Sequence, residues 1–425
     1  MNRTFYSLLF YLALPFILLR LWWRGQKAPA YKERWQERLG IIDKVAFGEK
    51  PLWIHAVSVG ETLAIVPLVK LIQQRHPNLP IVMTTMTPTG AERVQANFAD
   101  SVTHFYCPYD LPLSLSRFLT AVDPCGCVVV ETELWPNMIH ACHARRIPVL
   151  IANARLSARS ARGYARFAGL ARSMLQQINR IAVQNSTDGQ RFIDLGLPPS
   201  ALSVTGSIKF DISQPEGSAR LAAALRQMWG AQRPVLIGAS THEAEEAALL
   251  ATFAALKQRF PDLLLLLVPR HPERFQSVAS LIKAQGLNMA RRSNGDQPDS
   301  TTEVYLGDTM GELMKLLAAA DIAFVGGSLI ERGGHNPLEP AVLGKPVIMG
   351  PHVFNFQQIC DALADAGGLN IIESQKALTD AVATLLADPQ LAAEQGKRGA
   401  LFVQQNQGAL ERLYTLTEQV CLKPC

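Results

Sequence analysis

The sequence predicts an α/β protein with two doubly wound, Rossmann-like domains that face a cleft, preceded by an N-terminal membrane-anchor helix. After residue 50, short apolar segments alternate with amphipathic helical segments, and this pattern restarts after a polar stretch containing Pro and Gly at 210–219. The apolar segments are apolar throughout, which is typical of parallel strands that helices cover on both faces. A chain of 425 residues is long enough for two such domains.

The first element is an apolar segment at 5–23. Its 19 residues include one charge, Arg20, and about 20 apolar residues span a bilayer core. Trp22 and Trp23 resemble an interfacial belt, and the basic residues that follow predict a cytoplasmic body with the N-terminus outside, so that residues 1–24 form the anchor. Two alternatives remain: a helix lying in the interface, which Pro15 and Arg20 permit, and a cleaved signal peptide.

Two series of strand candidates follow the anchor. The first series comprises 51–58, 80–87, 104–108, 127–132, 148–154, 180–185 and 202–206, and the second comprises 234–240, 263–270, 303–309, 322–327, 346–351 and 369–374. They predict two α/β domains, at 25–212 and at 213–425, with the last helix able to pack back on the first domain. Ligands of such domains bind beyond the carboxyl ends of the strands.

The composition indicates a folded protein, and the distribution of charge indicates an anionic partner for the first half of the chain. With 18% charged and 48% hydrophobic residues, the chain is not intrinsically disordered. Residues 1–212 carry 23 Lys/Arg and 14 Asp/Glu, a net +9, whereas residues 213–425 carry 18 and 22, a net −4. The first half therefore suits nucleic acid, a phospholipid surface or a phosphorylated substrate. Seven cysteines, an odd number in a long chain, argue against a disulfide framework.

Ionisable residues follow several strand candidates of the first half. Glu61 lies in the first turn of a helix, where the dipole favours the ionised form that a general base requires, although Glu61 could equally only cap that helix. Glu131 and Glu133 end a buried strand, where they could hold a metal, shape an acceptor site or point to solvent. Lys209 could pair with a phosphate or carboxylate, or be an ordinary surface lysine.

An arginine-rich segment at 154–174 contains no acidic residue. Spacings of four, three and four place Arg155, Arg159, Arg162 and Arg166 on one stripe of a helix. Such a stripe could bind the phosphates of an acceptor or of a membrane surface, because guanidinium groups match phosphate bidentately. The alternative is a solvated helix face.

Four strand ends of the second half together predict a nucleotide-phosphate pocket: GASTHEAEE (238–246), VPRHPERF (268–275), GDTMGEL (307–313) and ERGGHNPLEPA (331–341). Helix N-termini and arginine side chains there would neutralise phosphate charge. The body contains no Asp-x-Asp, and the chain has no GxGxxG, GxxxxGK[ST] or HExxH motif. A bound metal is therefore not indicated.

Eight motifs, in this order and spacing, closely resemble the 3-deoxy-D-manno-octulosonate (Kdo) transferases of Gram-negative bacteria: HAVSVGE, TTMTPTG, ETELWPN, NARLS, TGSIKFD, VPRHPERF, GDTMGEL and ERGGHNPLEPA. The resemblance covers essentially the whole chain. It implies a GT-B fold and inverting, metal-independent transfer of Kdo from CMP-Kdo to the lipid A precursor (lipid IVA) in lipopolysaccharide biosynthesis. It also implies a place at the cytoplasmic face of the inner membrane, anionic membrane lipids as partners, no nucleic acid and no cofactor.

The resemblance further implies residue roles. Glu61 matches the proton acceptor of the family, and Glu131 and Lys209 match its suggested transition-state stabilisers. Its CMP contacts fall on Pro269, Arg270, Met310, Gly311, Glu312, Asn336, Pro337, Leu338 and Glu339. Two other functions stay open at this point: a GT-B transferase that uses a UDP-sugar, and a membrane-tethered sugar-nucleotide binding protein without turnover, which would need no base at Glu61.

Overall fold

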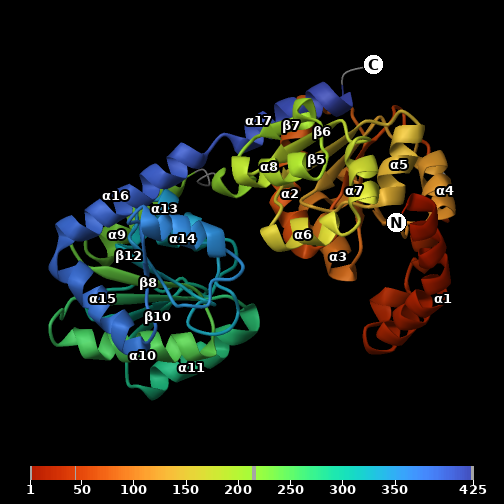
Figure 1. The fold of residues 1–425 in the computed structure, drawn as a ribbon. Coiled ribbons are helices and arrows are strands. Elements are labelled where there is room, and N and C mark those ends of the chain that lie inside the picture. The colour runs from red at the N-terminus through yellow and green to blue at the C-terminus, as the bar shows by residue number, and fades with distance from the viewer. Residues whose placement is uncertain (1, 44, 213–216, 423–425) are drawn as a thin grey trace. The chain divides into compact units, whose positions relative to one another are not determined.

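The protein, here a computed structural model, folds into two compact units (Figure 1). The structure describes residues 2–43, 45–212 and 217–422. The N-terminal unit comprises Met1–Asp211 and Gln407–Cys425, and the C-terminal unit comprises Ile212–Asn406. Residues 213–216, within the polar stretch at 210–219 that was expected to link the two domains, lie outside the described residues.

The N-terminal unit is built on a parallel sheet with the strand order β3-β2-β1-β4-β5-β6-β7. Its strands are β1 (Leu52–His55), β2 (Ile81–Thr85), β3 (Thr103–Tyr106), β4 (Gly126–Val130), β5 (Val149–Ala154), β6 (Arg180–Val183) and β7 (Leu202–Val204). The order reverses direction between β1 and β4, which is the point where ligands of doubly wound sheets bind.

The C-terminal unit repeats this plan, with the strand order β10-β11-β9-β8-β12-β13-β14, again all parallel. Its strands are β8 (Val235–Thr241), β9 (Leu264–Pro269), β10 (Met289–Arg291), β11 (Val304–Leu306), β12 (Ile322–Val325), β13 (Val347–Met349) and β14 (Leu369–Ile371). Here the order reverses between β8 and β12.

Helices supply the crossovers of both sheets. The N-terminal unit contains α1 (Arg3–Lys27), η1 (Pro29–Lys32), η2 (Trp35–Leu39), α2 (Val59–Arg75), α3 (Pro88–Phe98), η3 (Ala99–Ser101), α4 (Pro112–Val122), α5 (Pro136–Ala144), α6 (Ala158–Ala165), α7 (Ala168–Leu175), α8 (Ser186–Asp194), η4 (Pro199–Ala201), η5 (Ile208–Phe210), α17 (Ala409–Thr417) and η7 (Glu418–Leu422). The C-terminal unit contains α9 (Ser218–Trp229), α10 (Glu243–Lys257), η6 (Pro272–Arg274), α11 (Phe275–Ala284), α12 (Leu313–Ala319), α13 (Leu338–Val342), α14 (Gln357–Asp365), α15 (Gln375–Ala387) and α16 (Pro389–Asn406).

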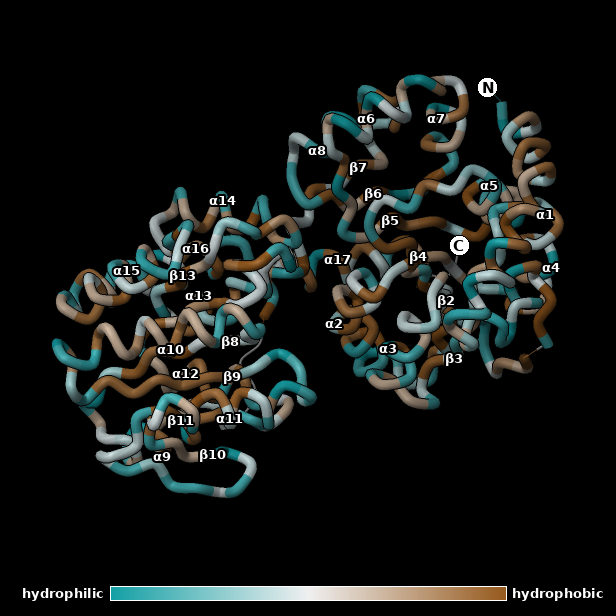
Figure 2. The backbone as a smooth tube through the Cα atoms, turned by 90° about the horizontal axis from the view of Figure 1, so that it is seen from below, coloured by the Kyte–Doolittle hydropathy of each residue, from teal (hydrophilic) through white to brown (hydrophobic). Residues whose placement is uncertain are grey.

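The core of the N-terminal unit lies on both faces of its sheet. Trp53 of β1 packs against α4, with ring centroids 5.0 Å from Phe118, whereas the neighbouring Ile54 belongs to the cluster on the other face with Leu68 of α2. Fully burying such a side chain contributes about 1.5–3 kcal/mol. Figure 2 shows β4 and β5 as hydrophobic tubes inside the unit. Two buried faces explain why the strand sequences do not alternate between apolar and polar residues.

The fold class is confirmed, and each of the thirteen strand candidates overlaps an observed strand. The structure adds β10, which the sequence did not indicate. This strand has only three residues, Met-Ala-Arg, and pairs at the sheet edge with β11 alone among the described strands. So short and mixed a segment carries no pattern from which a strand could be predicted.

The end of the chain returns to the N-terminal unit, where α17 packs with α2 (Figure 1). Leu413 and Tyr414 of α17 join the same buried cluster as Leu68. Asp211 fixes the start of α17, because its two carboxylate oxygens accept hydrogen bonds from the amides of Gly408 at 2.6 Å and Leu410 at 2.7 Å. One side chain therefore satisfies two amides that a helix start leaves open.

We expect Asp211→Ala to lower the free energy of unfolding of the N-terminal unit by about 2 kcal/mol, the cost of losing a capping carboxylate. Urea unfolding measures the change, and limited proteolysis should cut the chain near residue 407 sooner than in the parent. Asp100→Ala, at an exposed site in the same unit, is the control. Equal stability of the two variants would contradict the capping role.

Candidate active site

Three acidic residues follow β1 and β4, the two strands at which the order of the N-terminal sheet reverses, here called its switch point. The chain leaves β1 toward Glu61 and leaves the neighbouring β4 toward Glu131 and Glu133. Parallel neighbours present their carboxyl ends at one edge, so these side chains lie near one another. Glu131 and Glu133 are close enough that their charges act on Glu61.

Glu61 is held as the third residue of α2. Its carboxylate accepts hydrogen bonds from the amide of Val57 and the hydroxyl of Ser58, both at 2.7 Å, and Ser58 in turn caps the amide of Glu61 at 3.3 Å. The side chain is thus a cap, as the alternative interpretation expected. Glu61 is only 9% exposed, and burial raises its pKa to about 7, with repulsion from Glu133 and Glu131 adding to the shift.

This pKa corrects the expectation that the helix dipole simply keeps Glu61 ionised. The two hydrogen bonds do lower the pKa, but the loss of solvation outweighs them. A carboxyl that titrates near neutral pH is well suited to accept and release a proton at that pH.

Glu131 lies directly after β4 with a backbone φ of 59°, a left-handed conformation that is uncommon for a residue with a side chain. Its amide donates to the carbonyl of Ala152 at 2.8 Å, which ties the turn to β5. Glu133 accepts a hydrogen bond from the Trp135 indole at 2.8 Å. Backbone strain of this kind occurs where the surroundings hold a side chain in place, often at functional sites.

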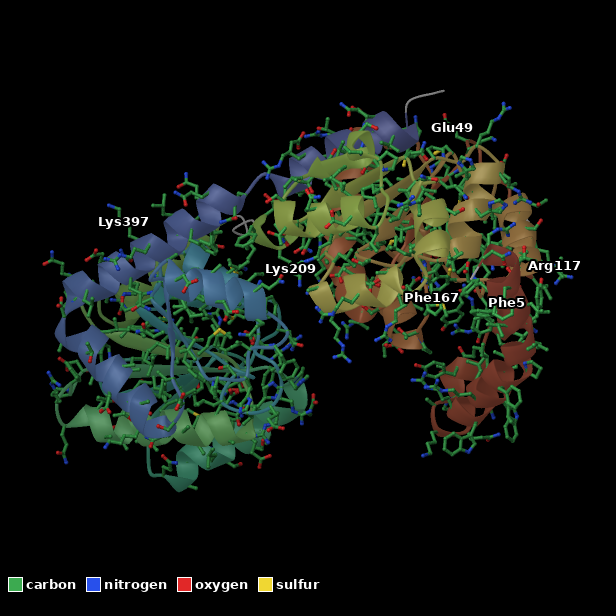
Figure 3. All side chains as sticks on the ribbon, viewed as in Figure 1. Phe5, Glu49, Arg117, Phe167, Lys209 and Lys397 are labelled. Atoms are coloured by element: carbon green, nitrogen blue, oxygen red, sulfur yellow. The ribbon has the colours of Figure 1, made fainter. Side chains whose placement is uncertain are left out.

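Two basic residues, Arg155 and Lys209, lie near the carboxylate of Glu131. Arg155 Nε lies 3.7 Å from Glu131 Oε2. Lys209 in η5 (Figure 3) is partly buried, and this burial lowers its pKa, while the charge of Glu131 opposes the shift and that of Arg155 adds to it. The structure therefore brings together Glu61, Glu131 and Lys209 of the sequence prediction within electrostatic reach.

His55 and Trp135 were quoted within motifs but given no role. His55 is fully buried at the end of β1, its Nδ1 lies 2.9 Å from Thr84 Oγ1, and its ring meets Trp135 edge-on at 5.0 Å. Its Nε2 has no hydrogen-bond partner among the described residues, and burial lowers the pKa of His55 to about 4. Its only sequence signal was a polar residue at the end of an apolar strand.

The helical stripe of four arginines was wrong in part, because only Arg159 and Arg162 lie within the helix. Ser157 caps α6 through the amide of Ser160, so the helix begins at Ala158 and Arg155 lies outside it, while Arg166 lies just past its end. Arg159, Arg162 and Arg166 still share an exposed hollow with Gly163 and Ala165. These three arginines form no ion pair within the part of the chain that the structure describes.

The switch point of the C-terminal sheet holds an internal carboxylate. Glu245 of α10 is fully buried and accepts amide hydrogen bonds from Gly327 at 2.8 Å, Ser328 at 2.9 Å and Leu329 at 3.0 Å. It also accepts from the amide of His242 at 3.1 Å. Glu245 therefore joins the end of β8 to the loop after β12 and fixes the backbone on which the neighbouring side chains stand.

Of the residues matched to CMP contacts, Pro269 is the last residue of β9, and the others follow strands of the C-terminal sheet. Arg270, after β9, is exposed and forms no ion pair among the described residues. Asn336 caps the amide of Leu338 at 3.1 Å, and burial raises the pKa of Glu339 while Asn336 and Arg270 oppose the shift. Pro337 precedes α13, and Met310 and Gly311 are exposed in the turn before α12.

The carboxylate of Glu312 forms an ion pair with Arg292. Arg292 donates to its two carboxylate oxygens at 3.0 and 3.1 Å, and Thr309 donates at 2.6 Å. These contacts lower the pKa of Glu312 to about 2. Its side chain positions the turn, which leaves the backbone of that turn to meet a ligand.

Three histidines lie beside Arg270: His271, noted with it in the motif VPRHPERF, and His242 and His335, to which the sequence assigned no role. His242 Nε2 lies 3.0 Å from His335 Nε2, and the rings are stacked, while His271 meets His242 edge-on at 5.6 Å. Burial and the charge of Arg270 lower the pKa of His335 to about 4. Neutral imidazoles of this kind can donate to an anion without carrying charge. Among the described residues, no group of three His, Cys, Asp or Glu side chains is placed to hold a metal ion.

Comparison with known proteins links the whole chain to one family. Residues 33–212 match the family model "3-Deoxy-D-manno-octulosonic-acid transferase (kdotransferase)", and residues 237–402 match "Glycosyl transferases group 1". The 3-deoxy-D-manno-octulosonic acid transferase of Haemophilus influenzae is 46% identical over 418 residues, 98% of each chain. That of Bordetella pertussis is 37% identical over 92% of each chain.

Solved structures show the same fold at low identity. MurG of Acinetobacter baumannii is 13% identical with a TM-score of 0.55, covering 87% of this chain and 100% of that one. The UDP-GlcNAc 2-epimerase of Neisseria meningitidis is 14% identical with a TM-score of 0.54, covering 88% and 100%. With the glycosyltransferase match of the second half, these likenesses establish the two-sheet GT-B fold.

The raised pKa of Glu61 makes a prediction about stability. Between the ordinary pKa of 4.5 and the folded value of about 7, the unfolded chain loses the Glu61 proton before the folded chain does. Rising pH therefore destabilises the fold through this group across that window. Glu61→Gln removes the titration, so its stability relative to the parent should be greater at pH 8 than at pH 5 by about 2 kcal/mol.

Urea unfolding at the two pH values measures this difference. Glu92→Gln, at an exposed position on α3, is the matched control and should show no such pH dependence. A Glu61→Gln variant whose stability relative to the parent is the same at pH 5 and pH 8 would contradict the raised pKa.

Proposed function

Since the chain belongs to the family of 3-deoxy-D-manno-octulosonic acid (Kdo) transferases of lipopolysaccharide biosynthesis, we propose that it transfers Kdo from CMP-Kdo to the lipid A precursor with inversion at the anomeric carbon. Family membership makes the chain a glycosyltransferase, and the non-catalytic alternative is set aside. The observation that best supports the reaction is the buried carboxyl of Glu61 at the switch point, with a pKa of about 7.

Glu61 is the proposed general base. Its carboxylate would accept the proton of a glucosamine 6-hydroxyl as that oxygen attacks the anomeric carbon of Kdo. Attack from the side opposite the CMP phosphate inverts that carbon. Val57 and Ser58 fix both carboxylate oxygens at 2.7 Å, so the base is oriented before the substrate arrives.

Lys209 and Glu131 are the proposed transition-state stabilisers. Burial disfavours the charge on Lys209, so the ammonium gains from a nearby anion such as the phosphate of departing CMP. Glu131 lies within reach of both Arg155 and Lys209 and would keep them oriented. The proposal gives Glu131 a positioning role toward these two cations.

CMP would be held by the C-terminal unit through Pro269, Arg270, Met310, Gly311, Glu312, Asn336, Pro337, Leu338 and Glu339. Arg270 is the exposed cation of this set and would meet the phosphate. Because Arg292 occupies the carboxylate of Glu312, the turn at 310–312 would offer its backbone to the nucleotide. No step of the proposal requires a metal.

The acceptor carries phosphates and acyl chains, so the enzyme must work at a membrane. The apolar helix α1 and the net positive charge of the first half support a place at the cytoplasmic face of the inner membrane. Arg159, Arg162 and Arg166, beside the exposed Phe167 (Figure 3), would face the phosphates of the acceptor or of anionic lipids.

The direct test is incubation of the purified chain with CMP-Kdo and lipid A precursor, followed by mass analysis of the product. A mass increase of one or more Kdo units is expected. CMP should compete with the donor, and UDP should not. Absence of any Kdo adduct with active controls of the same substrates would refute the proposed reaction.

We expect Glu61→Gln to reduce transfer by about 10²–10⁴, the usual loss on removing a general base, with CMP affinity unchanged. In the parent, kcat/KM should fall as the pH drops below about 7, because protonated Glu61 cannot accept a proton. The residual rate of the variant should lack this acid limb. Glu133→Gln is the matched control, a neighbouring acid expected to cost less, and a reversed order of the two variants would exclude Glu61 as the base.

Changing Arg159 and Arg162 together to Ala should raise the apparent KM for the lipid acceptor and leave that for CMP-Kdo unchanged. Each cation near an anionic surface contributes about 1 kcal/mol and is screened by salt, so the effect should shrink at high ionic strength. Steady-state kinetics at two salt concentrations measures it. Arg117→Ala, on α4 of the same unit, is the control. Equal effects on both substrates would assign the pair to the donor site or to the fold.

A further inference from the structure

The N-terminal half of α1 is docked on the body of its own unit. Asn137, on α5 and 1% exposed, accepts hydrogen bonds from Arg3 Nη1 at 3.2 Å and Ser7 Oγ at 3.0 Å. One turn further along, the hydroxyl of Tyr11 accepts the amide of Leu113 at 3.4 Å. Residues 3–11 therefore lie on the same side of any membrane as α4 and α5.

The segment that follows α1 returns to the same body. Arg38 is 2% exposed, its guanidinium lies 4.4 Å from the centre of the Tyr106 ring, and it donates to the carbonyl of Met86 at 3.2 Å. Glu37 accepts the amide of Tyr106 at 2.8 Å. Both ends of the segment between Tyr11 and Arg38 are thus fixed to one folded unit.

The helix between these two docked ends is too short to cross a bilayer. The part of α1 beyond the docked turns runs from Leu12 to Lys27. At about 1.5 Å per residue it extends about 24 Å, less than the roughly 30 Å of a hydrocarbon core. A crossing would also leave the return segment on the wrong side, since Arg38 is buried in the body.

The undocked face of α1 is an apolar stripe. Its members recur at helical spacing and are 45–73% exposed: Phe5, Leu8, Leu9, Leu12, Phe16, Leu19 and Trp23. The opposite face carries the buried Ser7 and Gly25. An apolar stripe on a docked helix is typical of a protein that lies in the membrane interface.

Basic groups and a hollow complete this surface. Arg20, Arg24, Lys27 and Lys32 are exposed near the far end of α1. A hollow of about 380 Å³ lies among mainly apolar side chains there: Leu18, Leu21, Trp22, Tyr31, Lys32 and Trp35. An apolar hollow that includes the cation Lys32 in its lining matches an acyl chain and the anionic headgroup above it.

We propose that α1 does not span the membrane but lies in one leaflet of an anionic bilayer, with the stripe toward the acyl chains, both ends on the side of the body and one lipid chain in the hollow. This proposal favours the interfacial helix that the sequence left open over the spanning anchor with its N-terminus outside. Apolar length alone could not reveal the docking to Asn137, because that contact joins residues far apart in the chain. The inference rests on the N-terminal unit alone and not on the proposed reaction.

Thiol labelling tests the topology. Thr4→Cys and Gln26→Cys, both at exposed positions near the two ends of α1, are expressed separately in the full chain. A membrane-impermeant maleimide should label both in inverted inner-membrane vesicles and neither in sealed right-side-out vesicles, with the parent chain as background. Labelling of Thr4→Cys only in right-side-out vesicles would establish a spanning helix and overturn the proposal.

Vesicle binding tests the stripe. The purified chain should bind vesicles of phosphatidylethanolamine and phosphatidylglycerol, and Phe16→Asp with Leu19→Asp should weaken binding at least about tenfold. Leu401→Asp, on α16 and 49% exposed, is the matched control and should bind as the parent does. Circular dichroism verifies that the variants are folded. If the stripe variant bound vesicles as well as the control does, the proposal that the apolar stripe of α1 lies in the bilayer would be refuted.

Discussion

A parallel strand can reach its neighbour only through a crossover, and every strand pairing in the two described sheets is parallel. The crossover helices cover both faces of each sheet, so residues in the middle of a strand are buried and cannot contact a substrate. What remains for function is the edge where the strands end. At β1 and β4, and again at β8 and β12, the chain diverges in opposite directions and leaves room for a ligand.

Glu61 combines structural and chemical roles in one carboxyl. The hydrogen bonds that Glu61 accepts from Val57 and Ser58 stabilise the start of α2 and favour the ionised carboxylate. Burial and the nearby charges of Glu131 and Glu133 favour the neutral carboxyl. The opposing effects leave the pKa near 7. A cap in water would stay ionised, and a buried acid without amide donors would stay protonated, so the intermediate pKa depends on having both environments at once.

The sequence was most informative where local pattern decides the structure. Apolar runs marked every strand except β10, and the strand–turn–helix pattern of the motif HAVSVGE predicted Glu61 in the first turn of a helix, where the structure places it. It was least informative where the outcome depends on contacts distant in the chain. Ser157 caps α6, so the helix begins after Arg155 and cannot carry the four arginines on one stripe. Arg292, twenty residues before Glu312, donates to the carboxylate that the sequence alone suggested was available to a ligand.

The path of the chain also has a consequence for how the protein is made. Because Gln407–Cys425 belong to the N-terminal unit, the C-terminal unit is an insertion within it. On the ribosome the C-terminal unit has all its strands before α17 emerges, whereas the first unit, although begun earlier, still lacks the helix that covers part of the face containing Ile54 and Leu68. Synthesis order and completion order are therefore reversed, and a nascent chain stopped before residue 407 exposes an apolar surface that a chaperone would recognise as unfinished.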